Sequence, residues 1–347
     1  MKATSFNTGW TCRHLGSSAP GTPVILPHDA MLAEERSQTS AGGTNTGWFA
    51  GYDYLYEKHF TPDAAQAAQC AVLEFEGVYH NAEVHLNGEK IASCPYGYSD
   101  FYADLTGKLL PDRDNVLEVI AHNADQPNSR WYSGAGIYRP VTLWTAPARH
   151  ILPDGVQVRT LSTDPAEVEV TVQTTASGAV AVAILDGEQT VATAQAESYG
   201  KAVLRVQIPN AKLWSPDSPA LYRCRAMFGD DCAETTFGVR TLSWGDDGFL
   251  LNGKRVILLG ACVHHDHGVL GACCYLEAEE RKVRLLQKVG YNAVRCAHNP
   301  CSKAFLDACD RLGMLVMDEY ADMWYIHKTQ YDYAGYLPDR WRQDLES

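Results

Sequence analysis

Residues 276–318, LEAEERKVRLLQKVGYNAVRCAHNPCSKAFLDACDRLGMLVMD, alternate between two kinds of apolar spacing. Residues 276–289 and 303–312 have the spacing of amphipathic helices, and the first of these is rich in Glu, Lys, Arg and Leu. The short apolar runs of the strand type are residues 256–259, 292–295 and 315–318. Strands that alternate with helices are typical of βα units, so the pattern predicts three parallel strands and two complete helices.

Before Trp244 the apolar residues follow a period of about two, in short runs separated by turn residues. The first group predicts a β-sandwich, with runs at residues 70–75, 82–86, 90–92, 116–121 and 141–144. The second group predicts a smaller immunoglobulin-like sandwich, with strands at residues 156–160, 168–174, 180–185, 202–208 and 222–227. Asn87-Gly88 separates two runs of the first group, and this dipeptide is the strongest short-range signal for a hairpin.

These patterns divide the chain of 347 residues into three domains. A single hydrophobic core usually stops growing below about 250 to 300 residues, so one core is not expected to serve the whole chain. We place the first sandwich at residues 1–150, the second at 151–245 and the βα units at 246–347, with the first boundary near residues 147–153. The predicted fold is therefore two all-β domains followed by an α/β domain.

The composition argues against several classes of function. A formal net charge of −13 opposes broad attraction to phosphate backbones or anionic lipids, so we expect neither nucleic acid nor a membrane as a partner. No stretch reaches the roughly 18 apolar residues of a transmembrane helix, and residues 1–15 lack the apolar segment of a secretory signal. The 11 cysteines show no disulfide framework, so we expect reduced thiols and a cytoplasmic location.

Five motifs carry a resemblance to a known family. They are LPHD at residues 26–29, WYSGAGIYRPV at 131–141, GACVHHDHGVLG at 260–271, NAVRCAHNP at 292–300 and CDRLGMLVMDE at 309–319. In this order they resemble glycoside hydrolase family 2 of the β-galactosidase type. The resemblance implies a jelly-roll sugar-binding-like domain, an immunoglobulin-like β-sandwich and the first βα units of an incomplete (β/α)8 TIM barrel. It also implies retaining hydrolysis of terminal β-linked sugars, with no redox or nucleotide cofactor.

The catalytic residues that this resemblance implies do not occur in the sequence. A retaining glycosidase needs two carboxyl groups about 5 to 5.5 Å apart. In the family both are glutamates, one in an Asn-Glu pair after the fourth barrel strand and one after the seventh. The chain holds no Asn-Glu pair, and Glu319 matches a non-catalytic position after the third strand. We therefore assign no catalytic residue and expect both glutamates beyond Ser347.

Two functions stay open at this point. The chain is either part of a glycosidase whose catalytic residues lie downstream, or a non-catalytic carbohydrate-binding or assembly protein. Three βα units cannot close an eight-stranded barrel, and the last parallel strand would present an unpaired edge, which proteins normally cover. That edge favours a truncated glycosidase. Enzymes for galactose, glucuronic acid and mannose share these motifs, and galactose is our choice as the commonest activity; homo-oligomerisation is left open.

The site is expected at the carboxyl ends of the barrel strands, where the active sites of TIM barrels lie. The candidate sugar-binding residues are His265 and Asp266 after the first strand, Arg295, His298 and Asn299 after the second, Asp318 and Glu319 after the third, and Trp324 on the next loop. Arg295 could also form a structural salt bridge with Asp318 or Glu319, and both roles can hold at once. Trp324 could seal a domain contact rather than stack on a sugar. No metal site is predicted, because the consecutive residues 264–267 cannot all face one centre.

Other polar residues and glycines in the motifs are expected to be structural. Gly134 and Gly136 permit a tight backbone turn. Arg139 is expected to pair with a carboxylate or to cap an interface. His28 and Asp29 belong to an N-terminal segment that often lies near the active site in the family, but Asp29 is expected to satisfy its own turn, as a loop aspartate usually does.

Overall fold

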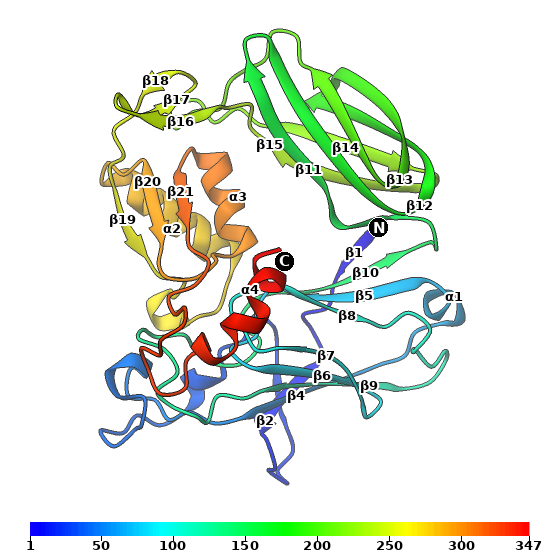
Figure 1. The fold of residues 1–347 in the computed structure, drawn as a ribbon. Coiled ribbons are helices and arrows are strands. Elements are labelled where there is room, and N and C mark those ends of the chain that lie inside the picture. Colours follow the sequence, from blue (N-terminus) through cyan, green and yellow to red (C-terminus); the bar gives the residue numbers. More distant parts are fainter. Residues whose placement is uncertain (347) are drawn as a thin grey trace.

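The computed structural model describes residues 1–346, and the predicted end of the third domain, Ser347, lies outside them. The chain folds into two β-sandwiches and a group of βα units (Figure 1). Among the described residues, none of the helices has both the length and the apolar character needed to cross a membrane.

The first sandwich packs two antiparallel sheets against each other (Figure 1). One sheet has the order β1 (Lys2–Ser5), β10 (Val141–Ala146), β5 (Cys70–Phe75) and β8 (Phe101–Asp104). The other has the order β3 (Thr22–Val24), β2 (Trp10–His14), β4 (Tyr54–Phe60), β9 (Asn115–Ala121), β6 (Ala82–Leu86) and β7 (Glu89–Cys94). Burial alternates along β9, where Leu117 and Val119 are fully buried and Glu118 is only half-buried. The two-residue apolar period thus faces the core between the sheets. Three short helices complete the domain, η1 (Ala30–Ala33), η2 (Gly43–Thr46) and α1 (Ala64–Ala67).

The predicted hairpin is confirmed, because β6 and β7 pair antiparallel with Leu86 opposite Glu89. Asn87 and Gly88 form its turn with φ angles of 52° and 83°. Positive φ at both central residues is the requirement of a type I′ turn, which asparagine and glycine meet with the least strain.

The second sandwich is built from five antiparallel strands and has a core of its own. Its strands are β11 (Ile151–Thr163), β12 (Ala166–Asp186), β13 (Gln189–Gln207), β14 (Tyr222–Phe228) and β15 (Asp231–Phe237). The prediction of separate strands at residues 168–174 and 180–185 is wrong, since both belong to β12. The pairing of β12 with β13 is irregular between Gln173 and Ser177 but resumes at Ser177, opposite Tyr199. The small residues between the two apolar runs therefore form a bulge in one strand rather than a turn.

The third domain begins with a small antiparallel sheet of β16 (Leu242–Gly245), β17 (Gly248–Leu251) and β18 (Lys254–Arg255). The predicted parallel sheet follows, with β19 (Gly260–Val263), β20 (Ala293–Cys296) and β21 (Leu315–Asp318). The two predicted helices are α2 (Leu276–Lys288) and α3 (Lys303–Leu312), which bury Val283 and Phe305 in one apolar cluster with β20. The remaining helices are η3 (Gly268–Leu270), η4 (Tyr333–Gly335) and α4 (Leu337–Glu346).

The first parallel strand was predicted at residues 256–259, and this position is wrong by four residues. The side chain of Asn292 donates to the carbonyl of Ile257 (3.0 Å) and accepts from the backbone N–H of Leu259 (2.8 Å). The carbonyl of Leu259 also accepts from the backbone N–H groups of Asn292 and Ala293, and the ladder itself starts where Gly260 pairs with Ala293. A side chain at Gly260 would meet the carbonyl oxygen of Ala293, so the close approach requires glycine.

Two polar side chains of the first domain hold loops of the third. The buried carboxylate of Asp29 accepts from the N–H of Met31 (3.1 Å), as expected for its own turn, and also from the N–H of Ala272 (2.9 Å). The fully buried Arg139 donates to the carbonyl of Pro300 (2.7 Å). Arg139 was expected to pair with a carboxylate or to cap an interface, and the structure shows the second of these roles.

Lys303, at the start of α3, is where the three domains meet. Its ammonium lies 2.9 Å from Asp100 of the first domain and 2.9 Å from Asp154 of the second, and it also contacts Glu74 on β5. The side chain of Glu74 is 4% exposed, so a cation beside it offsets the cost of burying its charge.

Candidate functional site

Because β19, β20 and β21 run parallel, their carboxyl ends lie at one edge of the sheet. The register places Val263 beside Cys296, and Cys296 beside Asp318. His265, Asp266, His298, Asn299 and Glu319 follow these positions within three residues. Arg295 lies within β20 and Asp318 ends β21, so the expected positions of these two residues after the strands are wrong. In a βα architecture this edge is where the loops from several strands can act on one ligand.

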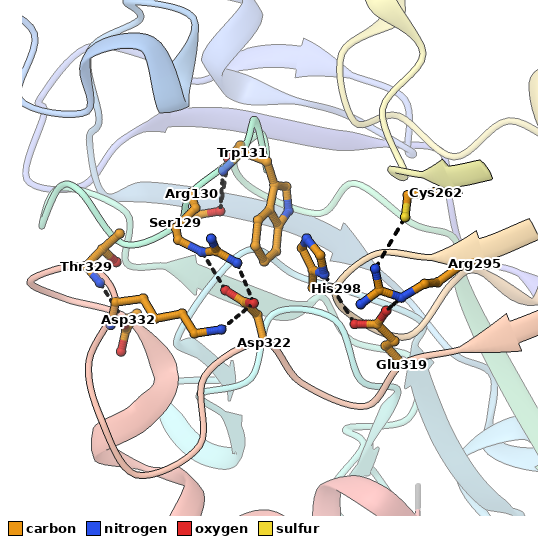
Figure 2. Close-up of polar contacts among 11 residues, drawn as sticks. Ser129, Arg130, Trp131, Cys262, Arg295, His298, Glu319, Asp322, Thr329 and Asp332 are labelled. Atoms are coloured by element: carbon orange, nitrogen blue, oxygen red, sulfur yellow. Dashed lines mark hydrogen bonds and ion pairs between the residues drawn. The ribbon is translucent and has the colours of Figure 1, made fainter.

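Glu319 brings two of the predicted residues together. Its carboxylate forms an ion pair with the guanidinium of Arg295 and lies 3.2 Å from Nδ1 of His298 (Figure 2). Arg295 also donates to Sγ of Cys262 (3.3 Å). The hydrogen bond to Cys262 and the charge of Glu319 raise the pKa of Arg295 above its ordinary value, so the guanidinium stays charged. Of the two salt bridges considered for Arg295, the one to Glu319 is present.

Trp131 reaches this cluster from the first domain. Its ring stacks on His264 at a centroid distance of 5.6 Å and an angle of 20°, and it lies 5.3 Å from the ring of His298. Figure 2 shows its indole beside His298, on the side away from Arg295. The ring of Tyr98 also lies against this indole, at a centroid distance of 6.3 Å and an angle of 32°. Trp131 was not among the predicted site residues, although its position in the WYSGAGIYRP motif was a signal that could have identified it.

An ion cluster around Asp322 pins the loop after β21 to the first domain. Arg130 donates to both carboxylate oxygens of Asp322, at 2.8 and 2.6 Å, and Nζ of Lys328 lies 2.7 Å away (Figure 2). Burial alone would raise the pKa of Asp322, but the hydrogen bonds from Arg130 and Lys328 outweigh it and hold the pKa below its ordinary value. These residues also were not predicted, because 192 positions separate Arg130 from Asp322.

Several predicted residues face other neighbours. The ring of His265 packs against Tyr98 and Tyr138, and burial lowers the pKa of His265 to about 3, so the imidazole is neutral. Asn299 is 3% exposed and lines a small cavity with His265. The carboxylate of Asp318 accepts from the N–H of Cys301 (3.1 Å).

The last two predicted residues lie on loops. Asp266 is half-buried between His265 and His267. Trp324 is 55% exposed and packs edge-on against Tyr320, at a centroid distance of 6.4 Å, rather than against the Arg295–Glu319–His298 cluster.

The imidazoles after β19 face different partners. His264 stacks on Trp131, and Nε2 of His267 lies 3.3 Å from Glu279. Within residues 1–346, three metal-ligand side chains come together at Glu74, Asp100 and Asp154, and again at Cys296, Cys301 and Asp318. Lys303 occupies the first of these groups.

Comparison with known proteins agrees with this architecture. Residues 27–149 match the model of the glycosyl hydrolase 2 galactose-binding domain-like family, residues 154–240 that of glycosyl hydrolases family 2, and residues 243–331 that of the family 2 TIM barrel domain. The structure has two β-sandwiches followed by a parallel sheet, and the chain matches three domains of one family in order. Together these two findings define the class of protein. The chain belongs to glycoside hydrolase family 2.

Individual relatives cover nearly the whole chain. A β-galactosidase of Bacteroides ovatus is 38% identical over 98% of this chain and 44% of its own length. A putative β-glucuronidase of Formosa agariphila is 33% identical over 92% of this chain and 32% of its own length. The crystal structure of a family 2 member from Bacteroides cellulosilyticus superposes with a TM-score of 0.92 at 34% identity, covering 100% of this chain and 49% of that one. The chain thus spans less than half the length of these relatives.

Proposed function

We propose that this chain forms the substrate-facing N-terminal part of a retaining glycosidase that removes terminal β-linked galactose. The observation that carries the proposal is the Arg295–Glu319–His298 cluster at the strand ends, with the indole of Trp131 beside it. Charged donors and an aromatic face are the groups that bind sugar hydroxyls and the apolar face of a pyranose. The catalytic glutamates are assigned to residues outside this sequence.

The charge balance of the site favours a neutral hexose over a uronic acid. A glucuronide carries a carboxylate, which binds most strongly to cations through charge-assisted hydrogen bonds. The cations described at this site pair with carboxylates of the chain itself, Arg295 with Glu319 and Arg130 and Lys328 with Asp322. The relative from Bacteroides ovatus is named a β-galactosidase and that from Formosa agariphila a putative β-glucuronidase, so the choice of galactose rests on the charges of the site.

The test uses a polypeptide that contains this chain and a complete barrel. We expect kcat/KM for nitrophenyl β-galactoside to exceed that for nitrophenyl β-glucuronide by at least about tenfold. The reverse ranking would contradict the assignment of the sugar. Residues 1–347 alone should show no turnover above background, since they lack the assigned acid and nucleophile. Hydrolysis by this chain that Glu319→Gln abolishes would show that the catalytic residues are misassigned.

A further inference from the structure

Cys296 and Cys301 flank the loop that carries His298 and Asn299. Cys296 is the last residue of β20, and Cys301 precedes Ser302, the N-cap of α3. Asp318 ends β21 and is the register partner of Cys296. One sulfur from each cysteine and one carboxylate oxygen of Asp318 all lie within 4.8 Å of one another.

We propose that Cys296, Cys301 and Asp318 form a binding site for a thiophilic divalent cation, for which Zn²⁺ is the best match. Two thiolates and a carboxylate are a donor set that Zn²⁺ accepts. With Zn–S bonds of about 2.3 Å, tetrahedral geometry sets two sulfurs about 3.8 Å apart. Since all three ligand atoms lie within 4.8 Å of one another, the separation of the two sulfurs exceeds this spacing by no more than about 1 Å.

The surroundings hold these ligands in place and leave room for a fourth. The N–H of Cys301 donates to Asp318 (3.1 Å), and Arg139 fixes the carbonyl of Pro300 (2.7 Å), so both sides of the set are oriented by hydrogen bonds. Cys301 and Asp318 also line a cavity of about 380 Å³, which a water or a further ligand can enter. Three protein ligands with one open position is a common arrangement for zinc.

The charges around this group differ from those of the acidic group at the domain junction. There, the ammonium of Lys303 lies between the carboxylates of Asp100 and Asp154. Among residues 1–346 Asp318 takes part in no ion pair, although Arg139 and Lys303 line the same cavity as Cys301 and Asp318. A bound cation would tie the loop of His298 to the end of β21, immediately before Glu319, and so stiffen the candidate site.

The inference can be tested without any sugar, on the reduced chain of 347 residues. Titration with Co²⁺ should give a thiolate-to-cobalt charge-transfer absorption that saturates at one equivalent, and Zn²⁺ should displace it. Cys301→Ser and Asp318→Asn should each weaken binding by more than about 100-fold, because each removes a direct ligand and loss of a supporting residue already costs 10- to 100-fold. Circular dichroism and the melting temperature of the metal-free variants verify that they fold.

Two exposed thiols provide matched controls. Cys262→Ser, on β19 beside Arg295, and Cys232→Ser, on β15, should leave the affinity and the stoichiometry unchanged. Absence of the charge-transfer band, or a band that survives Cys301→Ser, would overturn the proposal. A disulfide between Cys296 and Cys301 that persists in excess reductant would overturn it as well, since it removes both thiolates.

Discussion

Replacing Lys303 should loosen all three domains at once. Lys303→Met keeps the length of the side chain and removes the charge, which leaves the carboxylates of Glu74 and Asp100 without their cation. Removing one partner of a fully buried ion pair costs about 3 to 5 kcal/mol. The side chain of Lys303 is 39% exposed and solvent screens its charge, so we expect a smaller loss, about 2 kcal/mol, in the free energy of unfolding.

Scanning calorimetry of the chain measures this loss. For 347 residues that unfold as one unit, about 2 kcal/mol lowers the melting temperature by about 3 °C. Lys303→Arg keeps the positive charge and should retain most of the stability, so it is the matched control. An unchanged melting temperature in Lys303→Met, or equal losses in the two variants, would show that the charge of Lys303 does not hold the domains together.

In a polypeptide with a complete barrel, Arg295→Ala and His298→Ala should each lower kcat/KM for a β-galactoside by about 100-fold. Lost stability with normal specific activity would instead assign them to the scaffold. Burial, with the charge of the nearby Asp100, raises the pKa of Glu76 from 4.5 to about 7. The carboxyl group of Glu76 therefore binds a proton more readily in the folded chain than in the unfolded chain. Its protonation contributes to the stability of the fold fully below pH 4.5, and this contribution is lost as the pH rises through about 7. Glu76→Gln should flatten that loss in melts between about pH 5 and about pH 8, and parallel profiles would count against it. Asp29→Ala should cost at least about 3 kcal/mol, because it leaves several buried donors without an acceptor. Asp29→Asn keeps one oxygen and should cost less, so equal melting temperatures would refute this account.

The parts of the fold that local chemistry determines could be predicted from the sequence. Asn87-Gly88 specifies the β6–β7 turn. Ser302 caps the N-terminus of α3, and Gly313, in the left-handed conformation, ends the helix at its C-terminus. The parallel strand β19 was misplaced because its register depends on Ala293, a partner 33 positions away in the sequence. Apolar residues 257–259 carry no sign that the side chain of Asn292 bonds their backbone.

The site was predictable to a similar degree. Strand ends in a βα pattern indicated where His298 lies and that Arg295 is close to it, and Glu319 was one of the two carboxylates considered as the partner of Arg295. The contributions of the first domain were harder to predict. The motif at residues 131–141 pointed to Trp131 but not to its neighbours, and the Arg130–Asp322 pair depends on how two domains dock, which no spacing along one segment encodes.

The hydrogen bonds of Asp29 and Arg139 also bear on the order of events during synthesis. Both side chains belong to the sandwich that leaves the ribosome first, and their partners Ala272 and Pro300 follow 243 and 161 residues later. Domains generally fold as units from the N-terminus while translation proceeds. The first sandwich can therefore act as a preformed template, on which the loops after β19 and β20 take their shape as they emerge.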